Sequence, residues 1–147
     1  MGDAAHCSYP FAGNGAAQAI EDGAVLNALF QNVTKRSQIE DALRAYDTVR
    51  RPRSQKVVEI ARDFGRLYAF ALEGVADNVD NMKGFFKEKA AFTNNADLKA
   101  QNDEAVSLYE KLLAQSGRGS RTAGEEAHEQ RKNIEMSEVG RQPIYAT

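Results

Sequence analysis

Residues 2–22 read GDAAHCSYPFAGNGAAQAIED. The stretch places an acidic side chain, Asp3, before Pro10 and a Gly13-x-Gly15 turn, and a helix can start directly after the glycines. Glycine allows positive φ angles and lets backbone N–H groups approach a flat ligand, and a helix N-terminus stabilises negative charge. A Gly-x-Gly pair alone is more often an ordinary loop. The whole order is typical of a site for a polar, partly anionic ligand, although the buried strand that usually precedes such a site is not encoded.

The rest of the chain shows helical periodicity and no alternating pattern long enough for a strand. Ser37 and Glu40 fit a capping box. Pro52 predicts a break or kink near Arg51, because a proline and the residue before it both disfavour helical geometry. Gly74 is expected to end the helix after this break. The predicted helices span residues 16–31, 37–51, 54–73, 77–92 and 97–115, so the isolated chain is predicted to be mainly α.

Composition excludes several classes of partner and site. The 147 residues carry a net charge of -2, and no segment has the basic excess that nucleic-acid binding requires. The single cysteine, Cys7, excludes an internal disulfide and suits a reducing compartment, and with His6 and His128 it makes no zinc-ligand spacing, so no metal is expected. No apolar run approaches the roughly 18 residues of a membrane span, and no secretory signal is recognised. We expect a cytoplasmic protein.

A family resemblance is carried by eleven positions of the opening stretch. They are Gly2, Asp3, Ala4, Ala5, His6, Pro10, Gly13, Gly15, Ala19, Glu21 and Asp22. In this spacing they resemble the second FAD-binding motif of the flavoprotein aromatic hydroxylases, the FAD-dependent monooxygenases related to salicylate hydroxylase and para-hydroxybenzoate hydroxylase. A later run of Tyr46, Arg50, Arg51, Pro52 and Arg53, together with residues 65–68, is also similar to the region C-terminal to the motif in that family. The resemblance covers about residues 2–115.

The resemblance implies a cofactor, a reaction and a set of contacts. FAD would be the cofactor, with Asp3 on its ribityl chain and the helix N-terminus at the N1/O2 edge of the flavin. NAD(P)H would reduce the flavin, and dioxygen would then serve to hydroxylate an aromatic or similarly electron-rich small molecule. No catalytic side chain is identified. The cofactor-binding residues implied are Asp3, Pro10, Gly13, Asn14, Gly15 and Ala16.

Other elements of the family are absent from the 147 residues. The first dinucleotide fingerprint, G-x-G-x-x-G, seats the ADP half of FAD, and Gly117 and Gly119 cannot replace it because no helical pattern comes after them. The resemblance therefore implies the C-terminal portion of an α/β Rossmann-type FAD-binding fold, without its N-terminal dinucleotide domain and substrate sheet. Three regions are expected: the FAD motif with its helix at 1–36, a helical region at 37–115, and a disordered tail at 116–147.

Several other side chains are expected to have structural roles. His6 is expected to be hydrogen-bonded within the fold rather than catalytic, and Cys7 to be a small buried residue. Glu21 and Asp22 project about 100° apart on a helix, which excludes a shared-proton pair, and Asp22 is expected to pair within the fold. A helix-end role or a salt bridge, rather than phosphate binding, is expected of Arg50, Arg51 and Arg53. The expected core aromatics are Tyr46, Phe64, Tyr68 and Phe70.

Three interpretations of the whole chain remain open at this point. In the first, the chain is a portion of an FAD-dependent monooxygenase, is inactive alone and needs the missing N-terminal half. In the second, it is a non-enzymatic helical protein derived from such an enzyme, which acts as an interaction or regulatory partner through an exposed apolar surface. In the third, it is a subunit that binds FAD only with a complementing N-terminal FAD-binding chain. None of the three identifies the small-molecule substrate.

Overall fold

The computed structural model describes residues 1–117, which are helical and contain no strand. The elements are α1 (Asp3–His6), the short 3-10 turn η1 (Pro10–Ala12), α2 (Gly15–Phe30), the 3-10 turn η2 (Arg36–Gln38), α3 (Ile39–Tyr68), α4 (Val79–Asn94) and α5 (Leu98–Ser116). For these residues the prediction of a mainly α chain is confirmed. The tail expected at 116–147 lies, from residue 118 on, outside the described residues. None of the described helices is both long enough and apolar enough to span a bilayer.

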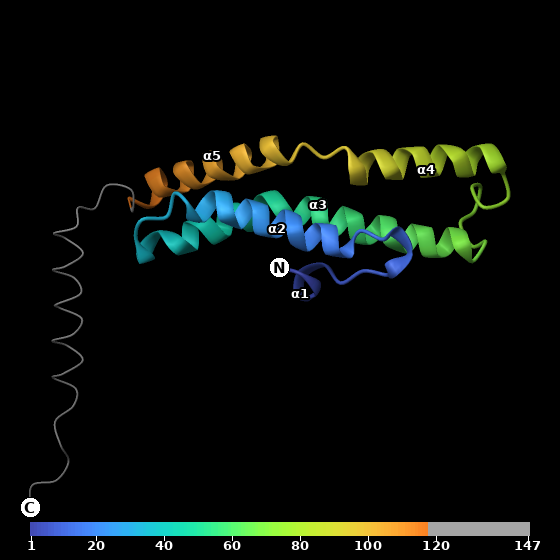
Figure 1. The fold of residues 1–147 in the computed structure, drawn as a ribbon, viewed down its shortest axis with the longest axis horizontal. Helices are drawn as coiled ribbons and strands as arrows, with labels where there is room; N and C mark the ends of the chain where they lie inside the picture. Colours follow the sequence, from blue (N-terminus) through green and yellow to red (C-terminus); the bar gives the residue numbers. More distant parts are fainter. Residues whose placement is uncertain (118–147) are drawn as a thin grey trace, which may run out of the picture.

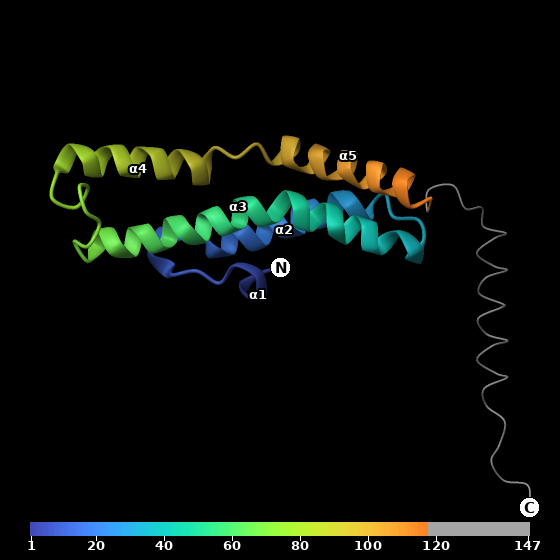
Figure 2. The ribbon, with the colours of Figure 1, turned by 180° about the vertical axis from the view of Figure 1, so that it is seen from behind.

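The long helix α3 is the axis on which the other elements pack (Figure 1). Its first half packs against α2 and α5, while α4 runs beside its second half, as the view from behind also shows (Figure 2). α1 lies against α2 and α3, and η1 lies against α3. The core between α2, α3 and α5 consists of small and branched apolar side chains and one tyrosine: Val25, Leu29, Ala42, Ala45, Ala105 and Tyr109.

α3 continues through Pro52, so of the break or kink predicted near Arg51 the break is wrong. A proline inside a helix removes one backbone hydrogen bond and typically costs about 3 kcal/mol or more. In this helix Arg50 and Arg53, on either side of Pro52, both bind the carboxylate of Glu21 on α2. These tertiary contacts hold both halves of the helix on the same neighbour, which explains why the chain stays helical there.

The C-terminal end of α3 also differs from the prediction, because the helix stops at Tyr68 rather than at Gly74. Phe70 adopts a left-handed conformation with φ 54°, and the Ala71 N–H donates to the Arg66 carbonyl at 2.8 Å. Such a helix end is usually occupied by glycine. The side chains of Tyr68 and Phe70 are 53% and 80% exposed, so neither is the core residue that was predicted.

Phe64 and α4 form a small aromatic cluster, separate from the main core. The Phe64 ring centroid lies 5.2 Å from that of Phe85 and 5.4 Å from that of Phe86. No residue of α4 is fully buried, and α4 is capped by Asn78, whose side chain accepts hydrogen bonds from the N–H groups of Asp80 and Asn81. Phe64 and Tyr46 are half-buried; Tyr46 packs against the main core, whereas Phe64 belongs to this separate cluster.

We expect Phe70→Gly to stabilise the chain by about 1 kcal/mol, because an L side chain pays roughly 1–2 kcal/mol in the left-handed region and glycine does not. The exposed ring contributes little packing that could be lost. Phe70→Ala is the control, since it removes the ring but keeps the Cβ atom and should leave stability within about 0.5 kcal/mol of the parent. Urea unfolding followed by circular dichroism measures both. An equal gain from the alanine variant would show that the ring, and not the backbone, is responsible.

Candidate functional site

Asp22, on α2, has no exposed surface and accepts hydrogen bonds from three donors in two separate parts of the chain. Its Oδ2 accepts from the Gly2 backbone N–H at 3.1 Å and from His6 Nε2 at 2.8 Å. Its Oδ1 accepts from Arg50 Nε at 2.9 Å. The contact confirms that His6 is hydrogen-bonded within the fold and supplies a carboxylate partner that the sequence did not reveal. Asp22 therefore ties residues 2–6 and α3 to α2.

Arg50, on α3, is the second centre of this network and is 1% exposed. Its Nη1 donates to Glu21 Oε2 at 2.6 Å and to Gln101 Oε1 of α5 at 3.1 Å. Its Nη2 donates to the backbone carbonyl of Gln18 at 3.2 Å and to the Gln18 side-chain oxygen at 3.0 Å. With Nε on Asp22, every guanidinium nitrogen has a partner, as a buried arginine requires.

Arg53 extends the network to the end of α4. It binds Glu21 with two nitrogens, Nε to Oε2 at 2.7 Å and Nη2 to Oε1 at 2.8 Å. Its Nη1 donates to the Phe92 carbonyl at 3.0 Å, and its guanidinium lies 5.3 Å from the Phe92 ring centroid. Arg51 instead pairs at the surface with Asp47. The salt-bridge role predicted for the three arginines is therefore confirmed.

The charges of this network keep both carboxylates ionised. Burial by itself would raise the pKa of Glu21, but the hydrogen bond and charge of Arg53, together with the charge of Arg50, outweigh it and lower that pKa. Burial likewise opposes ionisation of Asp22, yet hydrogen bonds from His6, Arg50 and the Gly2 N–H lower its pKa. Burial and the neighbouring Asp22 carboxylate raise the pKa of Tyr46 to about 12, so its hydroxyl stays protonated.

The residues predicted to bind a cofactor lie on the outside of the segment that this network holds. Asp3 begins α1 instead of following a strand; it is exposed and forms no ion pair or side-chain hydrogen bond within residues 1–117. Cys7 is exposed as well, contrary to the prediction, because the neighbouring His6 occupies the buried position of this turn. The two ends of the segment, Asp3 and the turn before α2, are linked by residues 7–12.

The turn before α2 leaves its backbone accessible. Gly13 has φ 65°, and a Cβ atom there would have nothing within 4 Å. Asn14 uses its side-chain nitrogen on the Ala12 carbonyl at 2.7 Å and does not cap α2 with its side-chain oxygen. The first turn of α2, at Gly15 and Ala16, therefore has no side-chain cap, which is the condition in which helix N–H groups can face a ligand.

Phe11 fixes η1 against α3. A Cβ atom at Gly65 would lie 2.8 and 2.9 Å from two carbons of the Phe11 ring, so glycine at this position permits the ring to lie on the helix. The Phe11 ring centroid is 6.0 Å from that of Tyr68 and 5.9 Å from that of Tyr9. Gly65 carries part of the family resemblance, but no local pattern in the sequence indicates its contact with Phe11.

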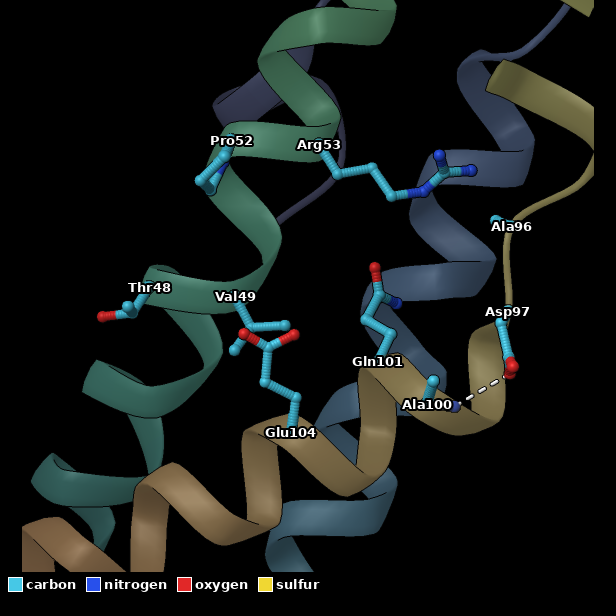
Figure 3. A pocket seen from close by; sticks show the side chains of 9 residues that line it. All are labelled: Thr48, Val49, Pro52, Arg53, Ala96, Asp97, Ala100, Gln101 and Glu104. Carbon is cyan, nitrogen blue, oxygen red and sulfur yellow. Dashed lines mark hydrogen bonds between the residues drawn. The ribbon is translucent and has the colours of Figure 1, made fainter. Parts of the chain in front are cut away.

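The hollow between α3 and α5 is not part of the predicted cofactor segment. It has a volume of about 470 Å³ and is lined by side chains of both helices and of the linker before α5 (Figure 3). Arg53 and Gln101, which line it, are also members of the buried network. Within residues 1–117 no three His, Cys, Asp or Glu side chains gather as a metal site would require.

Comparisons with known proteins match the same part of the chain. A family model described as "FAD binding domain" matches residues 1–61. The 6-methylsalicylate 1-monooxygenase atA of Aspergillus terreus is 42% identical over 113 residues, which are 77% of this chain and 25% of that protein. The FAD-dependent monooxygenase elcH of Phaeosphaeria nodorum is 36% identical over 113 residues, 77% of this chain and 23% of its own length. The chain thus spans about a quarter of the length of these curated relatives. No solved structure matches it.

Removing the Arg50 guanidinium should destabilise the chain strongly. Arg50→Met leaves the Glu21 and Asp22 carboxylates buried with fewer partners, and breaking a buried ion pair in this way costs about 3–5 kcal/mol. Arg44→Met, on the same helix, breaks only the exposed pair with Glu40 and should cost no more than about 0.5 kcal/mol. Chemical unfolding measures both variants. Similar losses in the two would contradict the central role given to Arg50.

The lowered pKa values of Glu21 and Asp22 predict acid sensitivity. A depressed carboxyl pKa adds stability that is present above the ordinary values of 4.5 and 3.8 and is lost as the pH falls through the lower native values. The free energy of unfolding should therefore decrease from about pH 5 downward. Asp22→Asn should flatten this dependence, whereas Asp47→Asn, at an exposed pair, should leave it nearly unchanged. An unaltered acid slope in Asp22→Asn would rule out this explanation.

Proposed function

The chain belongs to the FAD-dependent monooxygenases, and we propose that its residues 3–16 form one side of an FAD site. The observation that carries the proposal is that the residues of the motif fall into two groups, one buried and the other exposed to solvent. His6, Glu21 and Asp22 of the motif face inward and form hydrogen bonds within the buried network. Asp3 is exposed and forms no ion pair or side-chain hydrogen bond among the described residues, and Gly13 is exposed with its N–H bonded to the Pro10 carbonyl at 3.0 Å.

The exposed groups have the chemistry that the cofactor needs. The Asp3 carboxylate can accept hydrogen bonds from the hydroxyl groups of a ribityl chain, since an ionised carboxylate offers only acceptors. Pro10 and the backbone of Gly13 to Ala16 can lie against a flat ring, because no side chain stands above Gly13. Asn14 would contribute its backbone, as its side-chain nitrogen already binds the Ala12 carbonyl.

The start of α2 would face the edge of the ring system that gains negative charge on reduction. An uncapped helix N-terminus stabilises an anion by about 0.3–1 kcal/mol when exposed and by up to about 2 kcal/mol when partly buried. α2 is rigidly held for this purpose, because Glu21 and Asp22 in its second turn are bound to α3. Its N–H groups would therefore not need to reorganise when the charge develops.

The reaction we propose is hydroxylation of an aromatic or similarly electron-rich small molecule with NAD(P)H and dioxygen. The bound FAD would supply the redox chemistry, and the residues of this chain would orient it and exclude water. The name of the Aspergillus terreus relative, a 6-methylsalicylate 1-monooxygenase, supports an aromatic substrate. No side chain within residues 1–117 is assigned a proton transfer in this reaction.

We also propose that FAD binding requires polypeptide beyond residues 1–147, supplied in the same protein or by a complementing chain. A G-x-G-x-x-G fingerprint, which seats the ADP half of the cofactor, does not occur in the 147 residues. Asp3 and the exposed turn before α2 offer contacts to the ribityl and ring portions alone. A ligand that leaves half of its surface in water loses much of its binding energy.

Asp3→Asn tests the site in a chimera in which residues 1–117 replace the matching quarter of the Aspergillus terreus enzyme. We expect the chimera to retain FAD and the substitution to weaken FAD binding at least about tenfold, roughly 1.4 kcal/mol, through loss of a charged acceptor. Asp77→Asn is the matched control, because Asp77 is exposed and lies in the loop between α3 and α4. The measurement is flavin absorbance per folded protein after gel filtration.

Two results would contradict the proposal. If a folded chimera holds no FAD, the segment is not a cofactor site and the non-enzymatic interaction protein is favoured. If Asp3→Asn holds FAD as tightly as the parent chimera, Asp3 is not a ligand. Stoichiometric FAD on the 147-residue chain alone would contradict only the requirement for further polypeptide.

A further inference from the structure

The Asn14–Gly15 pair, in the turn before α2, carries a reactive side-chain amide. It is the one place in the 147 residues where an asparagine precedes a glycine, and the other eight asparagines precede larger residues. An asparagine loses ammonia when the backbone nitrogen of the next residue attacks its side-chain amide carbon. Glycine permits this approach because it has no Cβ atom. The sequence therefore singles out Asn14 for this modification.

The structure leaves both reacting groups of this pair accessible. The Gly15 N–H lies in the first turn of α2 and forms no hydrogen bond within residues 1–117, as is usual for the first N–H groups of a helix. Outside its own helix, a Cβ atom at Gly15 would meet only Ser8 Oγ, at 3.8 Å. The Asn14 side chain is half-buried, and its Nδ2 donates to the Ala12 carbonyl at 2.7 Å.

The backbone keeps the two reacting groups apart until the first turn of α2 opens. Asn14 has φ -107° and ψ 2°, so the Gly15 nitrogen is eclipsed with the Asn14 nitrogen and not with the Asn14 side chain. Ring closure needs a rotation about the bond between Cα and the carbonyl carbon of Asn14. This rotation breaks the hydrogen bond from the Gln18 N–H to the Asn14 carbonyl, which is 3.2 Å long. Helix ends open at little cost in free energy, so the fold slows the reaction and does not prevent it.

We infer that Asn14 is a site of spontaneous deamidation and that the resulting carboxylate closes the turn before α2 to an anionic ligand. In the first step, the Gly15 nitrogen loses its proton to hydroxide and bonds to Asn14 Cγ. The bond from Cγ to Nδ2 then breaks, and Nδ2 takes up a proton and leaves as ammonia. In the second step, water opens the cyclic imide. Cleavage at Cγ gives aspartate, and cleavage at the main-chain carbonyl carbon gives isoaspartate.

The products differ from asparagine in what they can bind. An ionised carboxylate has no donor, so aspartate cannot keep the hydrogen bond that Asn14 donates to the Ala12 carbonyl. Aspartate is among the best N-cap residues, because its oxygens accept from N–H groups of the first helical turn. In α2 these belong to Ala16 and Ala17, which have no side-chain cap. Isoaspartate carries the same negative charge and adds a carbon atom to the backbone of the turn.

The effect on the cofactor rests on the proposed function, whereas the modification itself requires only this chain. Bound FAD would lie against the backbone of residues 13–16 and would restrain the rotation that ring closure needs. A ligand that binds only the closed form slows every reaction that needs the open one. Protein with FAD would therefore be protected, and protein without FAD would be converted to a form that binds it more weakly.

The test of the modification is incubation of the full 147-residue chain, without FAD, at mildly alkaline pH, followed by peptide mapping with mass spectrometry. We expect Asn14 to be deamidated at least about tenfold faster than any of the other asparagines, because a glycine follows it alone. Circular dichroism confirms that the incubated chain is helical. A rate at Asn14 no higher than that of the other asparagines would overturn the inference.

Two glycine variants test the chemistry. Gly15→Ala adds a Cβ atom that obstructs the attack yet fits beside Ser8, and it should slow deamidation of Asn14 at least about tenfold. Gly23→Ala lies at an exposed position of the same helix, where the added atom meets nothing within 4 Å, and should change the rate by less than about twofold. Equal slowing in the two variants would show that the stability of α2 sets the rate, and would contradict the mechanism.

Two asparagine variants test the closing of the turn. Asn14→Asp reproduces the aspartate product, whereas Asn27→Asp makes the same change of charge at an exposed position near the other end of α2. We expect Asn14→Asp to raise the urea midpoint of the 147-residue chain, because it caps α2, and to weaken FAD binding by the chimera at least about fivefold. Asn27→Asp should do neither. Unweakened FAD binding in Asn14→Asp would contradict the closing of the turn.

The deamidation and FAD experiments fail independently. If Asn14 is deamidated in the chain but the chimera holds no FAD, the modification stands and the proposed function falls. If the chimera holds FAD and Asn14 is not deamidated in the chain, the inference falls and the proposed FAD contacts are unaffected. Saturating FAD should slow deamidation of Asn14 in the chimera at least about fivefold, and equal rates with and without FAD would contradict the protection.

Discussion

The buried ion pairs between α2 and α3 are the interaction on which the rest of this structure depends. Glu21 and Asp22 are adjacent on α2, and each faces a guanidinium of α3 at hydrogen-bond distance. Such groups are costly to bury unless they are hydrogen-bonded, and here Gln18, Gln101, His6 and the Gly2 N–H supply further hydrogen bonds to the charged groups. The network joins α1, α2, α3 and α5.

The same network explains how a short motif can serve both folding and binding. Some residues of the motif face the network and others face solvent. The hydrogen bond between His6 and Asp22 fixes the position of the backbone that carries the exposed residues Asp3 and Gly13. A ligand site gains most from groups that are held in place before the ligand arrives. This gives a physical reason for the presence of acidic, glycine and basic residues together in this part of the chain.

Local patterns in the sequence were sufficient for part of the fold. α2, α4 and α5 follow from helical periodicity and from their flanking residues, and the burial of Asp22 follows from its position beside Val25 on the helix. Three features could not be predicted locally. The continuity of α3 through Pro52 depends on Glu21, about thirty residues away in the sequence. The exposure of Cys7 depends on the burial of its neighbour His6. The end of α3 at Tyr68 places Phe70 at a position where glycine is the usual residue.

In the candidate site, the carboxylates Glu21 and Asp22 could be recognised from the sequence. Gln101 could not be recognised as a partner of Arg50, because helical spacing gives no information on contacts between helices that are distant in sequence.

The central claim, that Asp22 holds the proposed cofactor segment on the helical bundle, is tested most directly by hydrogen exchange in the folded chain. Amide protection is compared by mass spectrometry between the parent and Asp22→Asn, for residues 1–14 and for the buried turn of α5 around Tyr109. The account predicts faster exchange in residues 1–14, with little change around Tyr109, because local opening of one segment does not require global unfolding. Equal protection of residues 1–14 in both proteins would contradict it.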